Sequence, residues 1–261
     1  MLYESICSVN QRLVMGENVG EEEKQQVIGA ILSEPDFSHL VSKERYGKAR
    51  LSQAMYPEIF TMQERPGKLR LFTGELPKTM ILLYNSYELE SARLLALWAR
   101  GQDKVETILD LIERRLNKTC FGFFCPKGEG PGASVAVLRF WAAYKPDDVE
   151  RQREIMAGFK PHRDGRGSWS KGLTVPYFYL LSAFPECVYE VVEEELQYCS
   201  DQLWGILRKT WLDQPYNLLR KHVVKNALSL VPGYEFVANT SFYIGSDGRW
   251  HASTTEECKM E

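Results

Sequence analysis

The chain has 261 residues, of which 44% are hydrophobic and 26% are charged, and its formal net charge is −3. This composition is typical of a soluble globular protein and excludes a disordered or fibrous chain. A net charge this close to zero gives no global field that gathers nucleic-acid phosphates, so we expect no nucleic-acid partner.

The N-terminus and the cysteines indicate a compartment. Residues 1–13 have no basic cluster followed by an apolar core, so they do not resemble a secretory signal. No apolar run approaches the roughly 18 residues of a spanning helix, so we expect no membrane span. In a cytosolic chain of this length scattered cysteines are interpreted as free thiols, and here they are Cys7, Cys120, Cys125, Cys187, Cys199 and Cys258. We expect a cytoplasmic protein.

Apolar residues recur at helical spacing along most of the chain. Apolar stripes predict helices over residues 84–100, 103–118, 188–206 and 218–230, and two further helices are predicted after glycine-rich loops, over residues 133–144 and 174–184. Asp103 and Glu106 have the spacing of a capping pair at the start of the second of these helices. Strand signals are weak, at residues 68–72 and 235–244, and predict at most two hairpins. The sequence therefore predicts an all-α fold of about ten helices.

Residues 63–77 are the best candidate for a domain boundary, because prolines and glycines interrupt the pattern there. They would separate a helical cap over residues 1–75 from a main helical body over residues 76–261. The two parts could also form one continuous domain.

Two segments share an order of features. Residues 120–132 form a glycine-rich stretch before one predicted helix, and residues 159–172 form a similar stretch before another. A third piece, residues 245–250, repeats the Asp-Gly-Arg and the Gly-x-Trp of the second. Internal repeats of about 20 to 50 residues are typical of stacked helical units.

The pieces Gly167-Ser168-Trp169 and Gly248-Arg249-Trp250 resemble the repeat of the α/α-toroid proteins, a group that includes the triterpene cyclases and the protein prenyltransferases. The resemblance implies a loop tryptophan over the N-terminal end of an inner helix, and paired helices closing into a ring around an apolar cavity. The chain has neither the cyclases' Asp-x-Asp-Asp motif nor the prenyltransferases' Asp-x-Cys zinc pair. The resemblance therefore concerns the fold more than the chemistry.

The second loop also suits a purely structural role. Asp164-Gly165 is a turn dipeptide, because aspartate bonds its own backbone and glycine accepts a positive φ. Thr174 can cap the next helix, and Pro176 fits its first turn. Trp169 supplies a large apolar body whose one N–H needs a partner.

A basic loop is the strongest candidate for a binding site. Within 21 positions the sequence has Arg151, Arg153, Lys160, His162, Arg163, Arg166 and Lys171. Such groups suit a phosphate or carboxylate, and nearby aromatic side chains can form an apolar wall. We predict as ligand-binding residues His162, Arg163, Asp164, Arg166, Trp169, Tyr177 and Tyr179. The alternative is a solvated basic face balanced by Glu193, Glu194 and Glu195.

The sequence has no recognisable catalytic or metal-binding motif. Cys120 and Cys125 lack a second pair at ligand spacing, so we expect buried free thiols beside phenylalanines instead of a zinc site. His162 and Asp164 would form a dyad only if the loop folds back on itself. We predict no cofactor and no metal, and no catalytic residue is identified.

Charged pairs in the helix over residues 84–100 are interpreted as ordinary surface features. Glu88 and Glu90 lie two residues apart and face different sides, so they do not form a paired-carboxylate site. Glu90 and Arg93 have the spacing of a surface ion pair.

Three functions are compatible with these observations. The first is a helical-repeat binding protein with an apolar cavity, whose ligand is an apolar or anionic small molecule. The second is an enzyme that holds an apolar, prenyl-type phosphorylated substrate with a basic loop around Arg163 and Arg166. The third is a helical domain that binds a protein partner. The missing catalytic motifs favour the first.

Overall fold

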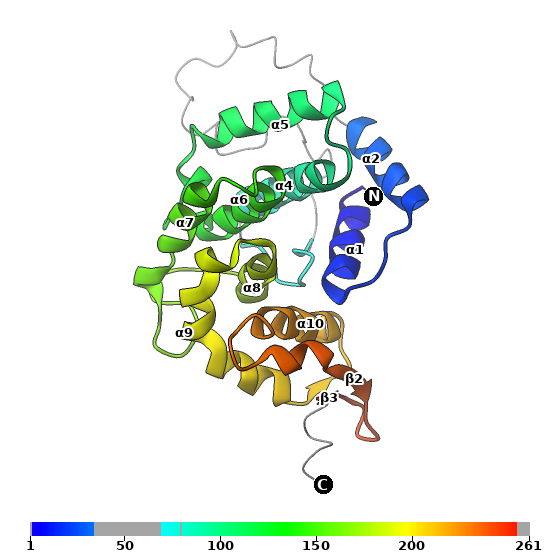
Figure 1. Ribbon diagram of the computed structural model, residues 1–261, viewed down its shortest axis with the longest axis vertical. Coiled ribbons are helices and arrows are strands. Elements are labelled where there is room, and N and C mark those ends of the chain that lie inside the picture. Colours follow the sequence, from blue (N-terminus) through cyan, green and yellow to red (C-terminus); the bar gives the residue numbers. More distant parts are fainter. Residues whose placement is uncertain (1, 34–68, 79, 255–261) are drawn as a thin grey trace.

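The computed structural model describes residues 2–33, 69–78 and 80–254 (Figure 1). Within these residues it contains nine α-helices and one small sheet, which confirms the mainly helical class predicted from the sequence. The helices are α1 (Leu2–Met15), α2 (Glu21–Ser33), α4 (Met80–Trp98), α5 (Asp103–Leu116), α6 (Gly130–Tyr144), α7 (Val149–Ala157), α8 (Tyr177–Ala183), α9 (Tyr189–Arg208) and α10 (Asn217–Leu228).

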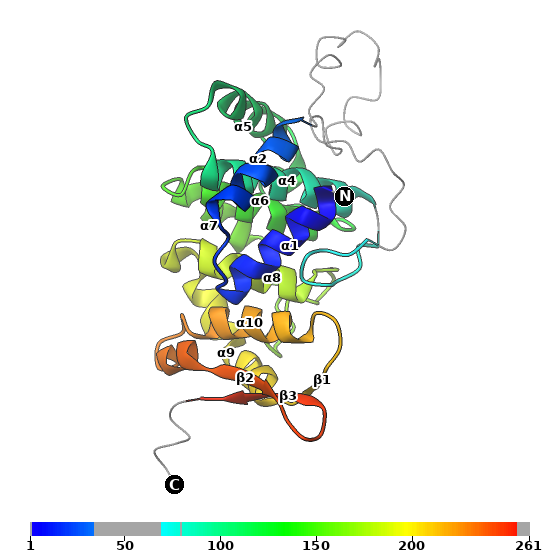
Figure 2. The same cartoon turned by 90° about the vertical axis from the view of Figure 1, so that its right-hand side faces the viewer.

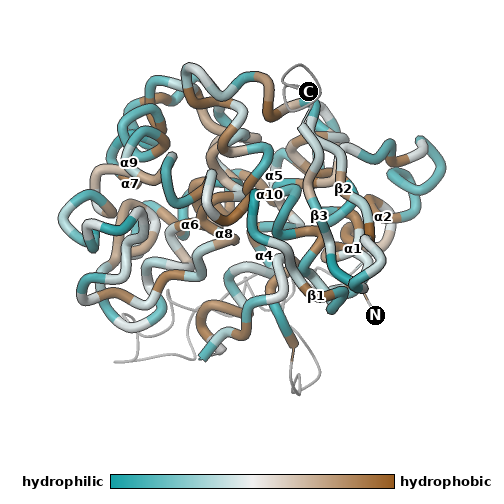
Figure 3. The backbone as a smooth tube through the Cα atoms, turned by 90° about the horizontal axis from the view of Figure 1, so that it is seen from below, coloured by the Kyte–Doolittle hydropathy of each residue, from teal (hydrophilic) through white to brown (hydrophobic). Residues whose placement is uncertain are grey.

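Four helices form a stack through the middle of the molecule. Helix α4 packs on α6, α6 on α8, and α8 on α10 (Figure 1). Helix α6 is buried along nearly all of its length, because its residues are apolar or small on every side. Apolar segments accordingly lie around α6 and α8, with hydrophilic segments toward the rim (Figure 3).

The other helices cover this stack. Helix α5 packs on α4, whereas α7 packs on α6 and α9 packs on α10. On another side α1 crosses the stack and contacts both α4 and α10 (Figure 2). None of the helices that the structure describes has the length and apolar character to cross a membrane.

The N-terminal helix is also tied to the segment that leads into α4. The hydroxyl of Tyr3 donates to the carbonyl of Arg70 (2.7 Å), and the amide of Gln11 donates to the carbonyl of Phe72 (2.9 Å). The predicted boundary at residues 63–77 lies mostly outside the described residues. The division at residue 75 stays a prediction.

Three short strands close the far end of the stack, beyond α10 (Figure 1). Strands β1 (Trp211–Leu212), β2 (Ser241–Ile244) and β3 (Arg249–Ser253) are antiparallel in the order β1-β3-β2. Phe242 of β2 packs against His222 of α10, with ring centroids 5.0 Å apart. The sheet therefore rests on α10 through its inner face.

The strand predictions were wrong in part. Residues 235–239 form a 3-10 helix, because the carboxylate of Glu235 accepts the backbone N–H of Gly233 and starts a turn there. Residues 69–72 form no strand. In the third copy of the predicted repeat Asp247 accepts the N–H of Arg249 and forms a tight β2–β3 turn, so this copy opens a strand and not a helix.

Two helix caps differ from the predictions. At α5, Asp103 lies inside the helix, while Glu106 reaches back to the N–H of Gly101 (2.8 Å). At α8, Thr174 makes no cap, because extended Pro176 is the residue that precedes the helix. The carboxylate of Glu75 instead accepts the free N–H groups of the second and third residues of α8, Phe178 (2.8 Å) and Tyr179 (3.1 Å).

Candidate functional site

The loop before α8 is organised by one carboxylate. The two oxygens of Asp164 accept the N–H groups of Arg166 (2.8 Å) and Ser168 (3.1 Å) and the hydroxyls of Ser168 (2.7 Å) and Ser170 (3.0 Å). These bonds, with that from the Ser168 hydroxyl foremost, hold the pKa of Asp164 well below its usual range. The loop is therefore fixed in shape and Asp164 stays ionised, as expected for a turn residue.

Helix α9 clamps this loop from the side. The hydroxyl of Tyr198 accepts the N–H of Gly165 (2.9 Å) and lies 3.0 Å from a carboxylate oxygen of Asp164. With its amide nitrogen facing the loop, Gln202 donates to the carbonyls of Arg166 and Gly167 (3.1 Å). Gly167 has a φ of +85°, and a Cβ there would lie 2.7 Å from the Cβ of Gln202. This close approach requires glycine.

Trp169 is buried beneath the loop. Its indole N–H donates to the carboxylate of Glu195 (2.6 Å), and its ring lies against Tyr177, the first residue of α8, at 6.1 Å between centroids. The ring also contacts Phe184 (5.8 Å between centroids), just after α8, and Tyr198 of α9 (5.8 Å), so it packs between the two helices. Trp250, in contrast, lies in β3 and donates to Asp213 (2.9 Å).

Two members of the predicted basic cluster are paired with carboxylates. The guanidinium of Arg163 binds Glu195 (2.8 Å) and Glu194 (3.2 Å), and the ammonium of Lys160 also binds Glu194 (2.8 Å). The guanidinium of Arg151 lies 3.5 Å from the ring centroid of Phe123. The ion pairs are of the kind expected for a solvated basic face balanced by glutamates, which the sequence offers as the alternative to a binding site.

The remaining predicted site residues do not converge on one point. The Nδ1–H of His162 donates to the carbonyl of Lys171 (2.9 Å) and helps to close the loop. The hydroxyl of Tyr177 lies 3.4 Å from the carbonyl of Gly167. Tyr179 is fully buried and bonds Glu90 (2.8 Å) in the interior, away from the loop. Arg166 is the predicted residue that lines a groove on the described surface.

That depression is a groove between the loop and α9, with a volume of about 510 Å³. One wall is residues 165–167, and the other is the face of α9 that carries Tyr198, Asp201 and Gln202. Its far end is bounded by Lys209, just after the helix. A volume of this size accommodates a small molecule.

Two cations in this groove are unpartnered. Arg166 and Lys209 are exposed, and among the described residues neither side chain has a hydrogen bond or an ion pair. Asp201 is the single acidic residue in the lining. Two cations and one carboxylate give the lining of the groove a net charge of +1. The carbonyls of Arg166 and Gly167 already accept hydrogen bonds from Gln202. The groove can therefore bind an anion.

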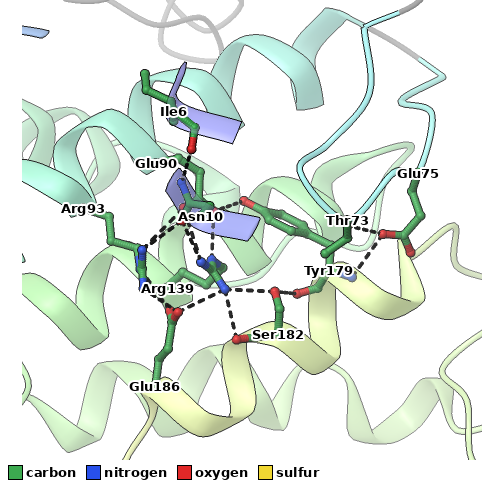
Figure 4. Close-up of polar contacts among 10 residues, drawn as sticks. All are labelled: Ile6, Asn10, Thr73, Glu75, Glu90, Arg93, Arg139, Tyr179, Ser182 and Glu186. Atoms are coloured by element: carbon green, nitrogen blue, oxygen red, sulfur yellow. Dashed lines mark hydrogen bonds and ion pairs between the residues drawn. The ribbon is translucent and has the colours of Figure 1, made fainter. Parts of the chain in front are cut away.

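A second polar cluster lies in the interior, where side chains from α1, α4, α6 and the end of α8 converge on Arg139 (Figure 4). Its guanidinium donates to Glu90 (2.8 Å), to the carbonyl and hydroxyl of Ser182 (both 2.9 Å), and to Asn10 (3.2 Å). Glu186 lies 3.1 Å away. Burial by itself lowers the pKa of Arg139, but charge-pairing with Glu186 and Glu90 outweighs it and raises that pKa above its usual range.

This cluster corrects the surface pair predicted for Glu90 and Arg93. Both are buried, with 5% and 6% of their surface exposed. Arg93 binds Glu186 on one side and donates to Asn10 (2.9 Å) on the other. Two arginines face two glutamates, so the cluster is neutral as well as fully bonded. It holds four segments together and offers no spare charge to a ligand.

The cavity beside this cluster is small. Tyr3, Cys7, Phe72 and Tyr179 are among its walls, and its volume is about 10 Å³. That is room for about one water molecule.

Metal-ligating residues and thiols are the remaining candidates for a site. Among the described residues, no group of histidines, cysteines and carboxylates is arranged to hold a metal ion. Cys120 and Cys125 are free, as expected, but Cys120 is exposed while only Cys125 is buried. Cys125 is covered in part by Gly130, where an added Cβ would lie 2.8 Å from the sulfur.

Comparison with protein-family models, curated proteins and solved structures gives no match to this chain. The assignment of a site therefore depends on its geometry alone.

The sequence identified Arg166 but missed the α9 side of the groove. Tyr198, Asp201 and Gln202 belong to a polar stripe of an amphipathic helix, which in a sequence is indistinguishable from any solvated face. Lys209 follows that helix in a loop. The i, i+3, i+4 spacing is the only signal, and it does not identify a groove.

Proposed function

We propose that this protein binds a small anionic molecule in the groove between the 165–167 loop and α9. The observation that carries the proposal is the pair of unpartnered cations, Arg166 and Lys209, at the edges of a 510 Å³ groove. The ligand class is a carboxylate or phosphate compound. Asp201 would accept a hydrogen bond from a hydroxyl or amine of the same molecule.

The rigidity of the loop supports this assignment. Asp164, Tyr198 and Gln202 fix the backbone on which Arg166 stands before any ligand arrives. A preformed wall lowers the entropy lost on binding. The side chain of Arg166 itself stays free to form a forked pair with an anion.

The alternative of a prenyl-type enzyme gains less support. It requires Arg163 and Arg166 to grip a diphosphate together, whereas the guanidinium of Arg163 is bound to Glu194 and Glu195. The interior cavity of about 10 Å³ is also too small for a prenyl chain. A binding function needs neither a second free arginine nor a large interior cavity.

We also propose that the helical body is an α/α toroid-like array of helix hairpins. The order of packing from α4 through α6 and α8 to α10, with α5, α7 and α9 as covering helices, supports it. In this proposal α1 fills the centre that related folds leave open. The predicted cytoplasmic location accords with a small polar ligand and stays a prediction.

Isothermal titration calorimetry with inorganic phosphate and with citrate tests the binding proposal. The Arg166→Ala and Lys209→Ala variants should each bind the better probe about tenfold or more weakly, because a charge-assisted hydrogen bond contributes about 1.5–3 kcal/mol. Lys171→Ala is the matched control, since Lys171 is an exposed cation of the same loop outside the groove. Equal binding by all variants, or no binding by the natural protein, contradicts the proposal.

A protein partner remains a second candidate because of the sheet. Leu212 of β1 and Tyr243 of β2 are 47% and 51% exposed, and they lie on the same face of the sheet, because their partners in β3, Arg249 and His251, are two residues apart. Exposed apolar side chains grouped in this way are typical of contact surfaces. Light scattering of natural protein and of a Leu212→Ser/Tyr243→Ser variant tests this; a monomer in both cases argues against self-association through the sheet.

A further inference from the structure

The groove beside α9 has charges of both signs at different places along the helix. The amide of Gln202 bonds the carbonyl of Arg166, so Arg166 lies beside the turn of α9 that also carries Asp201. Lys209 bounds the other end, about two turns or ~10 Å further along the helix axis. One end of the groove therefore has a cation and a carboxylate, and the other end has a cation alone.

The middle of the groove is apolar and open. Gly205 and Ile206 line it between the two charged ends. A Cβ added at Gly205 would meet no atom within 4 Å. The absence of a side chain at position 205 leaves room for a few methylene groups against the backbone of α9 and the side chain of Ile206.

The carboxylate of Asp201 is available to a ligand. Asp201 is exposed, and among the described residues its side chain has no hydrogen bond and no ion pair. It is therefore paired neither with Arg166 nor with Lys209. The groove has three separate charged groups that a single ligand can contact.

From this order of charges we infer that the groove binds an α-amino acid with an acidic side chain, of the glutamate type. The inference rests on the proposed function and specifies its ligand. The α-carboxylate forms a forked pair with Arg166, and the α-ammonium binds Asp201. The methylene groups lie over Gly205, and the side-chain carboxylate binds Lys209. Arginine and lysine have long side chains, so both cations reach inward to a ligand shorter than ~10 Å.

The net charges also match. At neutral pH such an amino acid has two carboxylates and one ammonium, and so a net charge of about −1. The lining has two cations and one carboxylate, the opposite arrangement. A simple anion would leave Asp201 facing a like charge, which lowers its affinity. The ammonium of an amino acid removes that repulsion.

A ligand with a large planar ring suits this lining less well. Tyr198 is the aromatic residue of the lining, and the guanidinium of Arg163 lies over its ring at 4.7 Å from the centroid. The same ring contacts Trp169 (5.8 Å between centroids). A nucleotide base would therefore gain little stacking here.

Calorimetric titration of the full chain with four probes tests the inference. The probes are L-glutamate, glutarate (which lacks the amine), L-glutamine (which lacks the side-chain charge) and inorganic phosphate. L-glutamate should bind about tenfold more tightly than glutarate or L-glutamine, because each of these lacks one charge-assisted hydrogen bond.

Two variants assign each preference to a residue. In Asp201→Asn the preference for L-glutamate over glutarate should disappear, because the ammonium loses its carboxylate partner. In Lys209→Ala the preference for L-glutamate over L-glutamine should disappear instead. Each variant removes one preference and retains the other, a pattern that general damage to the fold would not produce.

A third variant tests whether the ligand lies in the groove. Gly205→Leu should abolish L-glutamate binding, because the leucine side chain occupies the place of the methylene groups. Gly29→Leu is the matched control and should not change the dissociation constant. Both glycines are exposed, lie inside helices and have open space at the Cβ position, but Gly29 belongs to α2 and is not in the groove.

The possible results separate this inference from the proposed function. If phosphate binds and L-glutamate binds no more tightly than glutarate, the amino-acid ligand is overturned and an anion site remains. If neither phosphate nor L-glutamate binds, both proposals are overturned. Binding of L-glutamate that Gly205→Leu does not weaken would place the ligand outside the groove and would also overturn the inference.

Discussion

Replacing Arg139 with methionine should destabilise the protein strongly. Methionine is close to the length of the arginine stem and fills much of the same space, but it removes every hydrogen bond of the guanidinium. Glu90 then keeps the hydroxyl of Tyr179 (2.8 Å) and a distant contact with Arg93 (4.0 Å). Its carboxylate, with 5% of the residue exposed, loses its closest charge partner.

The magnitude follows from burial. Removing one partner of a buried ion pair costs about 3–5 kcal/mol, because the other charge stays desolvated. For a chain of this size each kcal/mol lowers Tm by about 2–4 °C, so Arg139→Met should lower Tm by about 10 °C. The double variant Arg139→Met/Glu90→Gln should recover part of this loss, because its side chain at position 90 carries no charge.

The matched control is Arg100→Met, which removes an exposed ion pair. Arg100 binds Glu106 at 2.9 Å, but the two side chains are 46% and 36% exposed. Such pairs contribute about 1 kcal/mol or less. Thermal unfolding followed by circular dichroism compares the three variants. Equal Tm values for Arg139→Met and Arg100→Met, with no recovery in the double variant, would refute the account of the buried cluster.

Three further substitutions test other parts of the structure. Glu75→Ala leaves two backbone N–H groups of α8 without a protein acceptor, so the free energy of unfolding measured in urea should fall by about 2 kcal/mol. A fall of less than about 0.5 kcal/mol would mean that water replaces the carboxylate as the acceptor. Gly167→Ala should destabilise the protein more than Gly172→Ala, because both glycines have a positive φ but only an added Cβ at position 167 meets another side chain, that of Gln202. Equal decreases in Tm by calorimetry would contradict the close approach of Gly167 to Gln202. Burial lowers the pKa of Lys221 to about 8 in the folded protein. Above that pH the unfolded chain binds more protons than the folded protein, so the free energy of unfolding should rise between about pH 8 and 10. That rise should be smaller in Lys221→Met, and identical pH profiles would argue against a buried ammonium.

The helices that the sequence predicted best have one apolar stripe each. In α5, Val105, Ile108, Leu109 and Ile112 are all buried, as their spacing indicates. The burial of α6 is different, because its residues are apolar on every side and no stripe can be recognised. The periodicity of apolar residues identifies a helix that packs one face on the core more readily than a helix that is buried on every side.

The buried ion pairs were missed because charge alone does not reveal burial. Glu90 and Arg93 have the spacing of a surface pair, and their partners lie on other helices. One signal was present, since Arg139 stands alone among the apolar residues of α6. A lone charge in such a helix must find a partner, and here it finds Glu90. The cap from Glu75 to α8 spans about 100 residues and left no local trace.

The central claim is that a small anion occupies the groove beside α9. Backbone amide shifts in a two-dimensional ¹H–¹⁵N spectrum, recorded during a titration with inorganic phosphate, measure this most directly. We predict that the signals of Gly165, Gly167 and Gly205 move together with one dissociation constant, while those of Gly101 and Gly172 do not move. Shifts confined to glycines outside the groove, or none at saturating phosphate, would contradict the account.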